Sequence, residues 1–107
     1  MKLKLYNNVT PDSLIRAGFK GSYSSKNIFR LREKLYKDCI TLTMKIDLAD
    51  EENQVEWDVI DANTGITYNT FYYTPNTCKD LVREEAIRNF KEIIADLDNR
   101  KILYMEE

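Results

Sequence analysis

The 107-residue sequence contains no histidine. This absence excludes Ser-His-Asp and Cys-His catalysis, zinc sites that use histidine, and histidine-based pH switching. The two cysteines, Cys39 and Cys78, are too few and too far apart for a zinc ribbon or a CxxC redox pair. Cys78, in the first turn of a predicted helix, is interpreted as a half-buried small residue rather than a reactive thiol. We expect reduced thiols, no metal and no cofactor.

Long apolar runs are also missing, and no window approaches the ~20 apolar residues of a membrane span. The first six residues alternate lysine with apolar side chains, unlike the apolar stretch of a signal peptide. With three glycines, two prolines, 43% hydrophobic and 32% charged residues, the composition is that of a globular chain. We therefore expect a single domain over residues 1–107, located in the cytoplasm and not in a membrane.

The net charge of −2 conceals an uneven distribution along the chain. Residues 1–46 contain ten Lys/Arg and three Asp/Glu, whereas residues 47–107 contain six Lys/Arg and fifteen Asp/Glu. The two parts thus carry +7 and −9. Such a distribution predicts a dipolar surface that selects charged partners.

A short N-terminal helix is predicted to begin at Thr10-Pro11-Asp12, which supplies a hydroxyl cap, a proline in the first helical position and an early acidic residue. Gly18 is placed to end this helix in a left-handed conformation. Gly21 and the serines that follow it are interpreted as a loop.

Apolar side chains then recur at every second position in segments separated by turn residues, which predicts β-strands. The segments are Asn27–Leu35, Ile40–Leu48, Val55–Ile60 and Ile66–Tyr73. From Thr77 the period changes to three and four residues, which predicts an amphipathic helix ending near Asn99. The short apolar tail Ile102–Tyr104 is expected to pack back onto the domain.

These elements predict an α+β fold. A short N-terminal helix precedes a four-stranded antiparallel β-meander, and a long C-terminal amphipathic helix packs on one face of the sheet in two layers. Trp57 and Phe90 are expected to be mostly buried and to face each other across the layers.

Four segments of the chain resemble small proteins of unassigned function carried by prophages and mobile elements of Gram-positive bacteria. They are Gly18-Phe19-Lys20, Tyr23-Ser24-Ser25, Ile40–Asp47 and Glu56–Asp61, and the resemblance spans roughly residues 12–103. The motifs are structural and transfer no functional residue. Because small accessory phage proteins often bind and block a host protein, the resemblance implies an inhibitor of this kind.

Basic side chains share one face of the first two long strands, and they have two interpretations. Arg30, Arg32, Lys34 and Lys45 are the candidates for a nucleic-acid-binding face, which would use phosphate contacts. The alternative is protection of a sheet edge by charged residues, with Glu33 pointing to the apolar side. Acidic residues of the third strand on the same face make nucleic acid the less favoured partner.

The acidic residues between the second and third strands also have several interpretations. Asp50, Glu51 and Glu52 are predicted to steer a charged partner electrostatically. The alternatives are a solvated hairpin tip, mimicry of the phosphate spacing of DNA, and a Ca²⁺ or Mg²⁺ site, although the spacing lacks the EF-hand pattern. Glu56 and Asp58 project about 7 Å apart from one strand face. No pocket is evident around them, so we expect no catalytic residue and no enzyme.

The aromatic residues of the fourth predicted strand fall on both of its faces. One face is expected to pack in the core, and the other is either exposed or covered by a terminal segment. Exposed tyrosines are typical of protein interfaces, so Tyr68, Tyr72 and Tyr73 are the predicted anchors for a protein partner. We therefore predict a non-enzymatic binding or regulatory protein, with a nucleic-acid-binding module as the alternative. The partner is not identified, and a homodimer stays open as an assembly.

Overall fold

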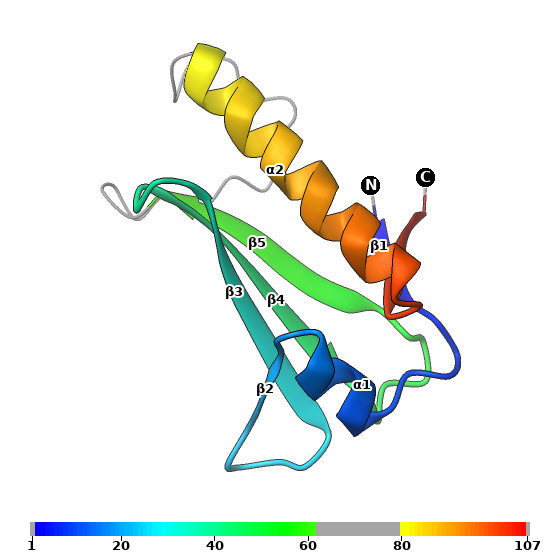
Figure 1. Cartoon of the computed structure of the whole chain (residues 1–107). Coiled ribbons are helices and arrows are strands. Elements are labelled where there is room, and N and C mark those ends of the chain that lie inside the picture. The colour runs from blue at the N-terminus through cyan, green and yellow to red at the C-terminus, as the bar shows by residue number, and fades with distance from the viewer. Residues whose placement is uncertain (1, 62–79, 107) are drawn as a thin grey trace.

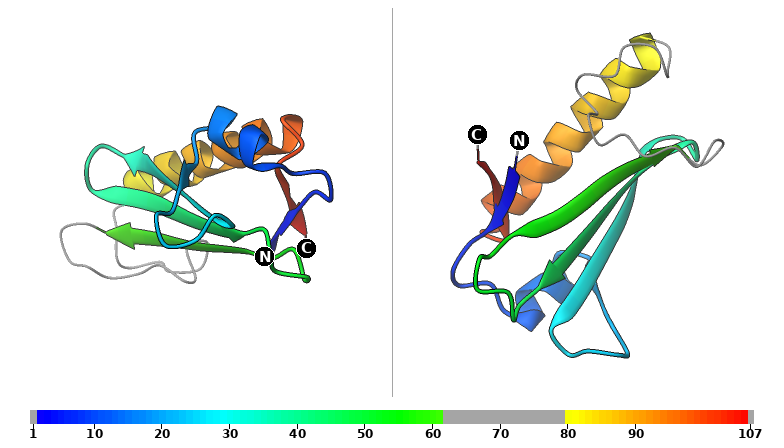
Figure 2. Two further views of the ribbon diagram at one scale, coloured as in Figure 1. Left: turned by 90° about the horizontal axis from the view of Figure 1, so that it is seen from below. Right: turned by 180° about the vertical axis from the view of Figure 1, so that it is seen from behind.

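The structure is a computed structural model, and it describes residues 2–61 and 80–106. The order of elements is shown in Figure 1: β1 (Lys2–Leu5), α1 (Pro11–Arg16), β2 (Lys20–Gly21), β3 (Ile28–Tyr36), β4 (Ile40–Asp47), β5 (Val55–Asp61), α2 (Asp80–Asn99) and β6 (Leu103–Glu106). Strands β2, β3, β4 and β5 form an antiparallel sheet in that order, and β1 pairs with β6 in a separate ribbon. Both helices lie on one side of the four-stranded sheet (Figure 2). The predicted α+β class with two layers is confirmed.

The sheet contains three of the predicted strands and one segment that was predicted as a loop. β3, β4 and β5 form the expected meander. The fourth strand of the sheet, β2, pairs Lys20 with Arg30 and Gly21 with Phe29. Two residues are too short to show a period, so only the distant pairing partner identifies them as a strand. The predicted strand Ile66–Tyr73 lies outside the described residues.

The core lies between the sheet and the helices. In register across the meander, Leu31 pairs with Met44 and Met44 with Trp57, and this row faces α2. The ring of Trp57 lies 5.1 Å from that of Phe90, as predicted. Phe90 is fully buried, but Trp57 is half-buried rather than mostly buried, because β5 is an edge strand of the described sheet.

Helix α1 forms for the reasons expected from its sequence. The Thr10 hydroxyl accepts a hydrogen bond from the Ser13 amide at 3.2 Å, and the Ser13 hydroxyl accepts one from the Thr10 amide at 3.0 Å. This reciprocal capping box satisfies two amides at the start of the helix. Gly18 follows the helix with φ +102°, and the Phe19 amide donates to the Leu14 carbonyl at 3.0 Å. The chain turns sharply there and buries Phe19 under the sheet.

The two ends of the described chain meet beside α2 (Figure 1). α2 ends at Asn99 as predicted, whereas its predicted first residues, 77–79, lie outside the described residues. The apolar tail does pack back: Ile102 and Leu103 are buried, and Leu103 pairs with Leu5 of β1. The alternation in residues 1–6 is therefore that of a strand, which the sequence alone did not identify.

Tyr6 ties this ribbon to the end of α2. Its hydroxyl donates a hydrogen bond to the Asp98 carboxylate, and its ring lies 4.9 Å from that of Tyr104. The ammonium group of Lys101 lies 5.2 Å from the centre of the Tyr6 ring. The hydrogen bond to Asp98, together with partial desolvation, raises the pKa of Tyr6 above its usual value of 10.0.

This raised pKa predicts an alkaline dependence of stability. A proton held more tightly by the folded than by the unfolded protein stabilises the fold fully below the unfolded pKa. The contribution of Tyr6 is therefore complete below pH 10 and is lost as pH rises through the folded pKa. We expect the stability difference between the parent and Tyr6→Phe to shrink between pH 9 and about pH 11. Urea unfolding at both values measures it, and a constant difference would contradict the prediction.

Candidate binding surface

The face of the sheet that points away from α2 carries ionic side chains in rows across the strands. One row runs Lys20, Arg30, Lys45 and Glu56, from β2 to β5. The next row runs Arg32, Thr43 and Asp58. Positive charge therefore lies on the β2–β3 side of this face, and negative charge lies on β5.

A hollow of about 680 Å³ opens on this face. The ionic residues that line it are Lys20, Arg30, Arg32, Glu33, Lys45, Glu56 and Asp58. The structure therefore brings together three of the four predicted basic residues and adds Lys20. Sequence reasoning missed Lys20 because β2 was interpreted as a loop, and its pairing with Arg30 is the only signal for it.

The basic residues differ in the counter-ions that they meet. Lys45 lies 3.9 Å from the Glu56 carboxylate, a loose and partly exposed pair. Lys34, the fourth predicted basic residue, pairs with Asp38 at 2.5 Å, and its hydrogen bond lowers the pKa of that carboxyl. Within residues 2–61 and 80–106, no carboxylate forms an ion pair with Lys20, Arg30 or Arg32. These three cations are available to an anionic partner.

The main chain of β3 also presents hydrogen-bonding groups at the edge of the sheet. The Ser22 amide donates to the Ile28 carbonyl at 3.1 Å, which shows that the main-chain groups of Ile28 point away from β4. In an antiparallel strand these directions alternate, so those of Arg30, Arg32 and Lys34 point the same way. β2 reaches only as far as Arg30. In the part of the chain that the structure describes, the outward main-chain groups of Arg32 and Lys34 have no hydrogen-bond partner.

Local structure limits this free edge at both ends. At one end, Gly18 lies beside the Leu31 side chain of β3 and turns the chain with φ +102°, and β2 starts only at Lys20. At the other end, the pairing of β3 with β4 shifts between Lys34 and Tyr36. The Leu35 carbonyl, released by this bulge, accepts a hydrogen bond from the Asn89 side-chain amide of α2 at 2.7 Å.

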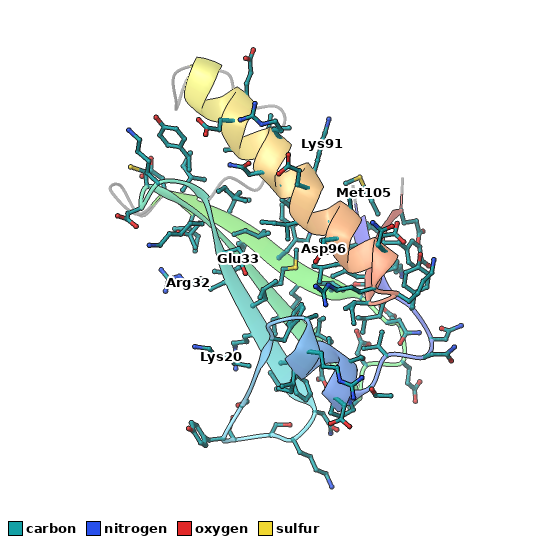
Figure 3. The ribbon with its side chains drawn as sticks, viewed as in Figure 1. Lys20, Arg32, Glu33, Lys91, Asp96 and Met105 are labelled. Atoms are coloured by element: carbon teal, nitrogen blue, oxygen red, sulfur yellow. The ribbon has the colours of Figure 1, made fainter. Side chains whose placement is uncertain are left out.

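A second hollow, of about 380 Å³, lies on the other side of the same edge, between β3, α1 and α2. Its ionic lining consists of Glu33, Lys34, Glu92 and Asp96, and all four are exposed. Figure 3 shows Lys20 and Arg32 projecting away from α2, whereas Glu33 projects towards α2 and Asp96. Glu33 thus points to the otherwise apolar side, as predicted. Asp96 is paired with Arg100 at 2.9 Å.

The predicted steering residues lie elsewhere. Asp50, Glu51 and Glu52 form the turn between β4 and β5 and do not line either hollow. A carboxylate oxygen of Asp50 accepts a hydrogen bond from the Glu52 amide at 3.1 Å, which stabilises the turn. Glu51 and Glu52 are exposed, and their role in steering stays a prediction.

The predicted anchors Tyr68, Tyr72 and Tyr73 lie outside the described residues. The structure does describe two other aromatic side chains of interest. Tyr23, in the loop between β2 and β3, is fully exposed, whereas the ring of Trp57 packs against Phe90 on the α2 side of the sheet. The sequence assigned Tyr23 to a loop, but its exposure depends on how that loop is held.

Glu56 and Asp58 are exposed on the open face. Over the described ranges, no three Asp, Glu or Cys side chains are grouped so that they could hold a metal ion. No helix that the structure describes is long and apolar enough to cross a membrane.

Comparison with known proteins identifies the fold alone. No family model matches the chain, and no curated protein matches it significantly. The structure is similar to the crystal structure of a DUF1831 family protein from Lactobacillus plantarum, with a TM-score of 0.73 and 18% sequence identity. The match covers 97% of this chain and 86% of that one. The likeness supports the α+β architecture over nearly the whole chain.

Proposed function

We propose that this chain is a non-enzymatic binding protein that engages a protein partner through the open face of its sheet. The observation that carries the proposal is the gathering of Lys20, Arg30 and Arg32 beside the larger hollow, with no carboxylate partner among the described residues. A partner that presents acidic side chains to the β2–β3 side of the hollow matches this charge. The resemblance to prophage proteins adds the proposal that the partner is a host protein, which this chain blocks.

The distribution of charge on the face favours a protein over a nucleic acid. Glu56 and Asp58 share the face with the basic residues, and they would repel a continuous phosphate backbone. A protein surface carries charges of both signs and can complement both halves of the face. Tyr23 and the two arginines are also the residue types that contribute most to protein–protein binding energy.

A salt titration with defined probes tests the function. We expect a ten-residue glutamate peptide to bind the parent at least about tenfold more tightly than it binds Arg30→Glu/Arg32→Glu. We expect random single- and double-stranded oligonucleotides to bind no tighter than ~100 μM at physiological salt, because the net charge is −2. Fluorescence anisotropy of labelled probes measures both affinities.

The matched control is Arg88→Glu/Lys91→Glu, which makes the same change of charge on the outer face of α2. It should leave peptide binding nearly unchanged. Equal weakening by the two double variants would show that only net charge matters and would overturn the proposed surface. Micromolar oligonucleotide binding that Arg30→Glu/Arg32→Glu abolishes would assign the nucleic-acid function instead.

A further inference from the structure

We propose that the partner contributes an extended segment that adds as a strand to the free edge of β3, with acidic and basic side chains in alternation. This inference deepens the proposed function and rests on its premise that the partner is a protein. It follows from the side chains on the two sides of this edge: Lys20, Arg30 and Arg32 lie on the open-face side, whereas Glu33 and Glu92 lie on the α2 side.

Strand addition first requires unpaired main-chain groups, and β3 has them. The outward amide and carbonyl groups of Arg32 and Lys34 match the groups of an added strand. The turn at Gly18 and the Asn89–Leu35 hydrogen bond limit the free edge, here called the slot, to about three residues from Arg32 to Lys34, or roughly 10 Å of strand. A single extended segment of a partner fits this length, and no sheet of several strands is needed.

The side chains supply the pattern. In an added strand, the residue opposite Arg32 points to the open face, where Lys20 and Arg30 also lie. Its two neighbours point to the α2 side, towards Glu33 and Glu92. An acidic residue on the open face and basic residues on the α2 side complement both hollows at once.

The same features explain why other strands are rejected. An inward-pointing charge, a bulge and basic residues are the devices by which natural proteins prevent edge-to-edge aggregation. Glu33, the bulge beyond Lys34, and Arg32 are such devices. They exclude an apolar strand, because it would bury the Glu33 carboxylate without a partner. A strand with matched charges avoids this cost. The residues that protect the edge from aggregation therefore also select which strand can bind there.

A second copy of the chain does not fit the slot. Antiparallel pairing of two β3 edges about a twofold axis at Glu33 would place Glu33 opposite Glu33 and Arg32 opposite Lys34. Shifting the register by two residues still places basic residues opposite basic residues on the open face. Like charges directly opposite each other destabilise such pairs.

Three eight-residue peptides test the inference on the full chain. The first alternates glutamate and lysine, the second has the same composition with four glutamates followed by four lysines, and the third is the alternating peptide N-methylated at every second residue. We expect the alternating peptide to bind at least about tenfold more tightly than the other two. We also expect it to slow amide hydrogen exchange at Arg32 and Lys34.

The variant Glu33→Lys separates strand addition from simple attraction to the basic face. It should weaken binding of the alternating peptide by about tenfold, because lysines of the peptide would meet a lysine. It should not weaken binding of the all-glutamate peptide. Glu84→Lys makes the same change of charge on the outer face of α2 and should alter neither affinity.

Equal affinity of the alternating and block peptides, or unchanged exchange at Arg32, would overturn strand addition. If the alternating peptide binds no more tightly than the block peptide but the all-glutamate peptide binds as expected, strand addition is wrong and the proposed function remains. If neither the alternating nor the all-glutamate peptide binds below millimolar concentration, both strand addition and the proposed function are wrong. A dimer of the free chain that Arg32→Glu disrupts would overturn the choice of a foreign segment over a second copy.

Discussion

Replacing Phe90 with alanine is expected to lower the free energy of unfolding by about 3–5 kcal/mol. Phe90 is fully buried, and its ring lies 5.1 Å from that of Trp57 on the sheet. It is the largest fully buried side chain of the described part of α2. Removing the ring leaves a cavity between the two layers, which surrounding side chains only partly fill. Such a loss is comparable to the whole stability of many small domains.

Urea unfolding followed by Trp57 fluorescence measures this loss, because the indole lies against the substituted ring. The control is Lys91→Ala, the next residue on α2, which is exposed and should change stability by no more than about 0.5 kcal/mol. If the urea midpoint of Phe90→Ala lies close to that of the control, the packing of Phe90 against the sheet does not stabilise the fold as predicted.

Leu103→Ala is expected to cost about 2–5 kcal/mol, although the residue lies only four positions from the end of the sequence. Leu103 is fully buried in β6 and pairs with Leu5 of β1. Leu3 and Leu5, also buried, contribute to the same core. The substitution therefore opens a cavity where the two terminal strands meet α2.

Thermal and urea unfolding of Leu103→Ala are compared with those of Glu106→Ala. Glu106 is exposed and lies at the end of the same strand, so its substitution should be nearly neutral. The two variants thus distinguish the loss of core packing at Leu103 from a general effect of any substitution in β6. Equal, small effects of both would mean that the β1–β6 ribbon is dispensable for the fold.

Elements with a strong local signal were predicted from the sequence with little error. Alternation over eight residues identified β4, because each step of two residues returns a side chain to the same face. Thr10, Pro11 and Gly18 identified the start and end of α1, because their preferences for caps and for positive φ are local. The contact between Trp57 and Phe90 followed from the two apolar faces.

Elements that are defined by their pairing partner and not by their own period were missed. β2 is two residues long and exists because β3 offers it an edge. β1 requires β6, which follows it by almost the whole length of the chain. The β1–β6 pairing is non-local, because Lys2 pairs with Glu106, and no short window of sequence contains both strands.

The candidate surface likewise contains residues that the sequence identified and residues that it missed. The alternation of Arg30 and Arg32 with apolar residues already indicated a basic strand face, and Glu33 already stood out on the apolar side. Neither Lys20 nor Tyr23 was a candidate, because each is placed by the short pairing of β2 with β3. The acidic turn residues Asp50–Glu52 were candidates by charge alone, and they lie away from both hollows.

The sequence by itself determined the class of fold, the facing of the long strands, the capped first helix and the exclusion of histidine chemistry. These follow from periodicity and residue type, which act over a few neighbouring positions. Only the tertiary structure decided where the sheet ends and what borders its edge. The turn at Gly18 and the Asn89–Leu35 hydrogen bond leave Arg32 and Lys34 uncovered, because α1 and α2 come to β3 from distant parts of the chain.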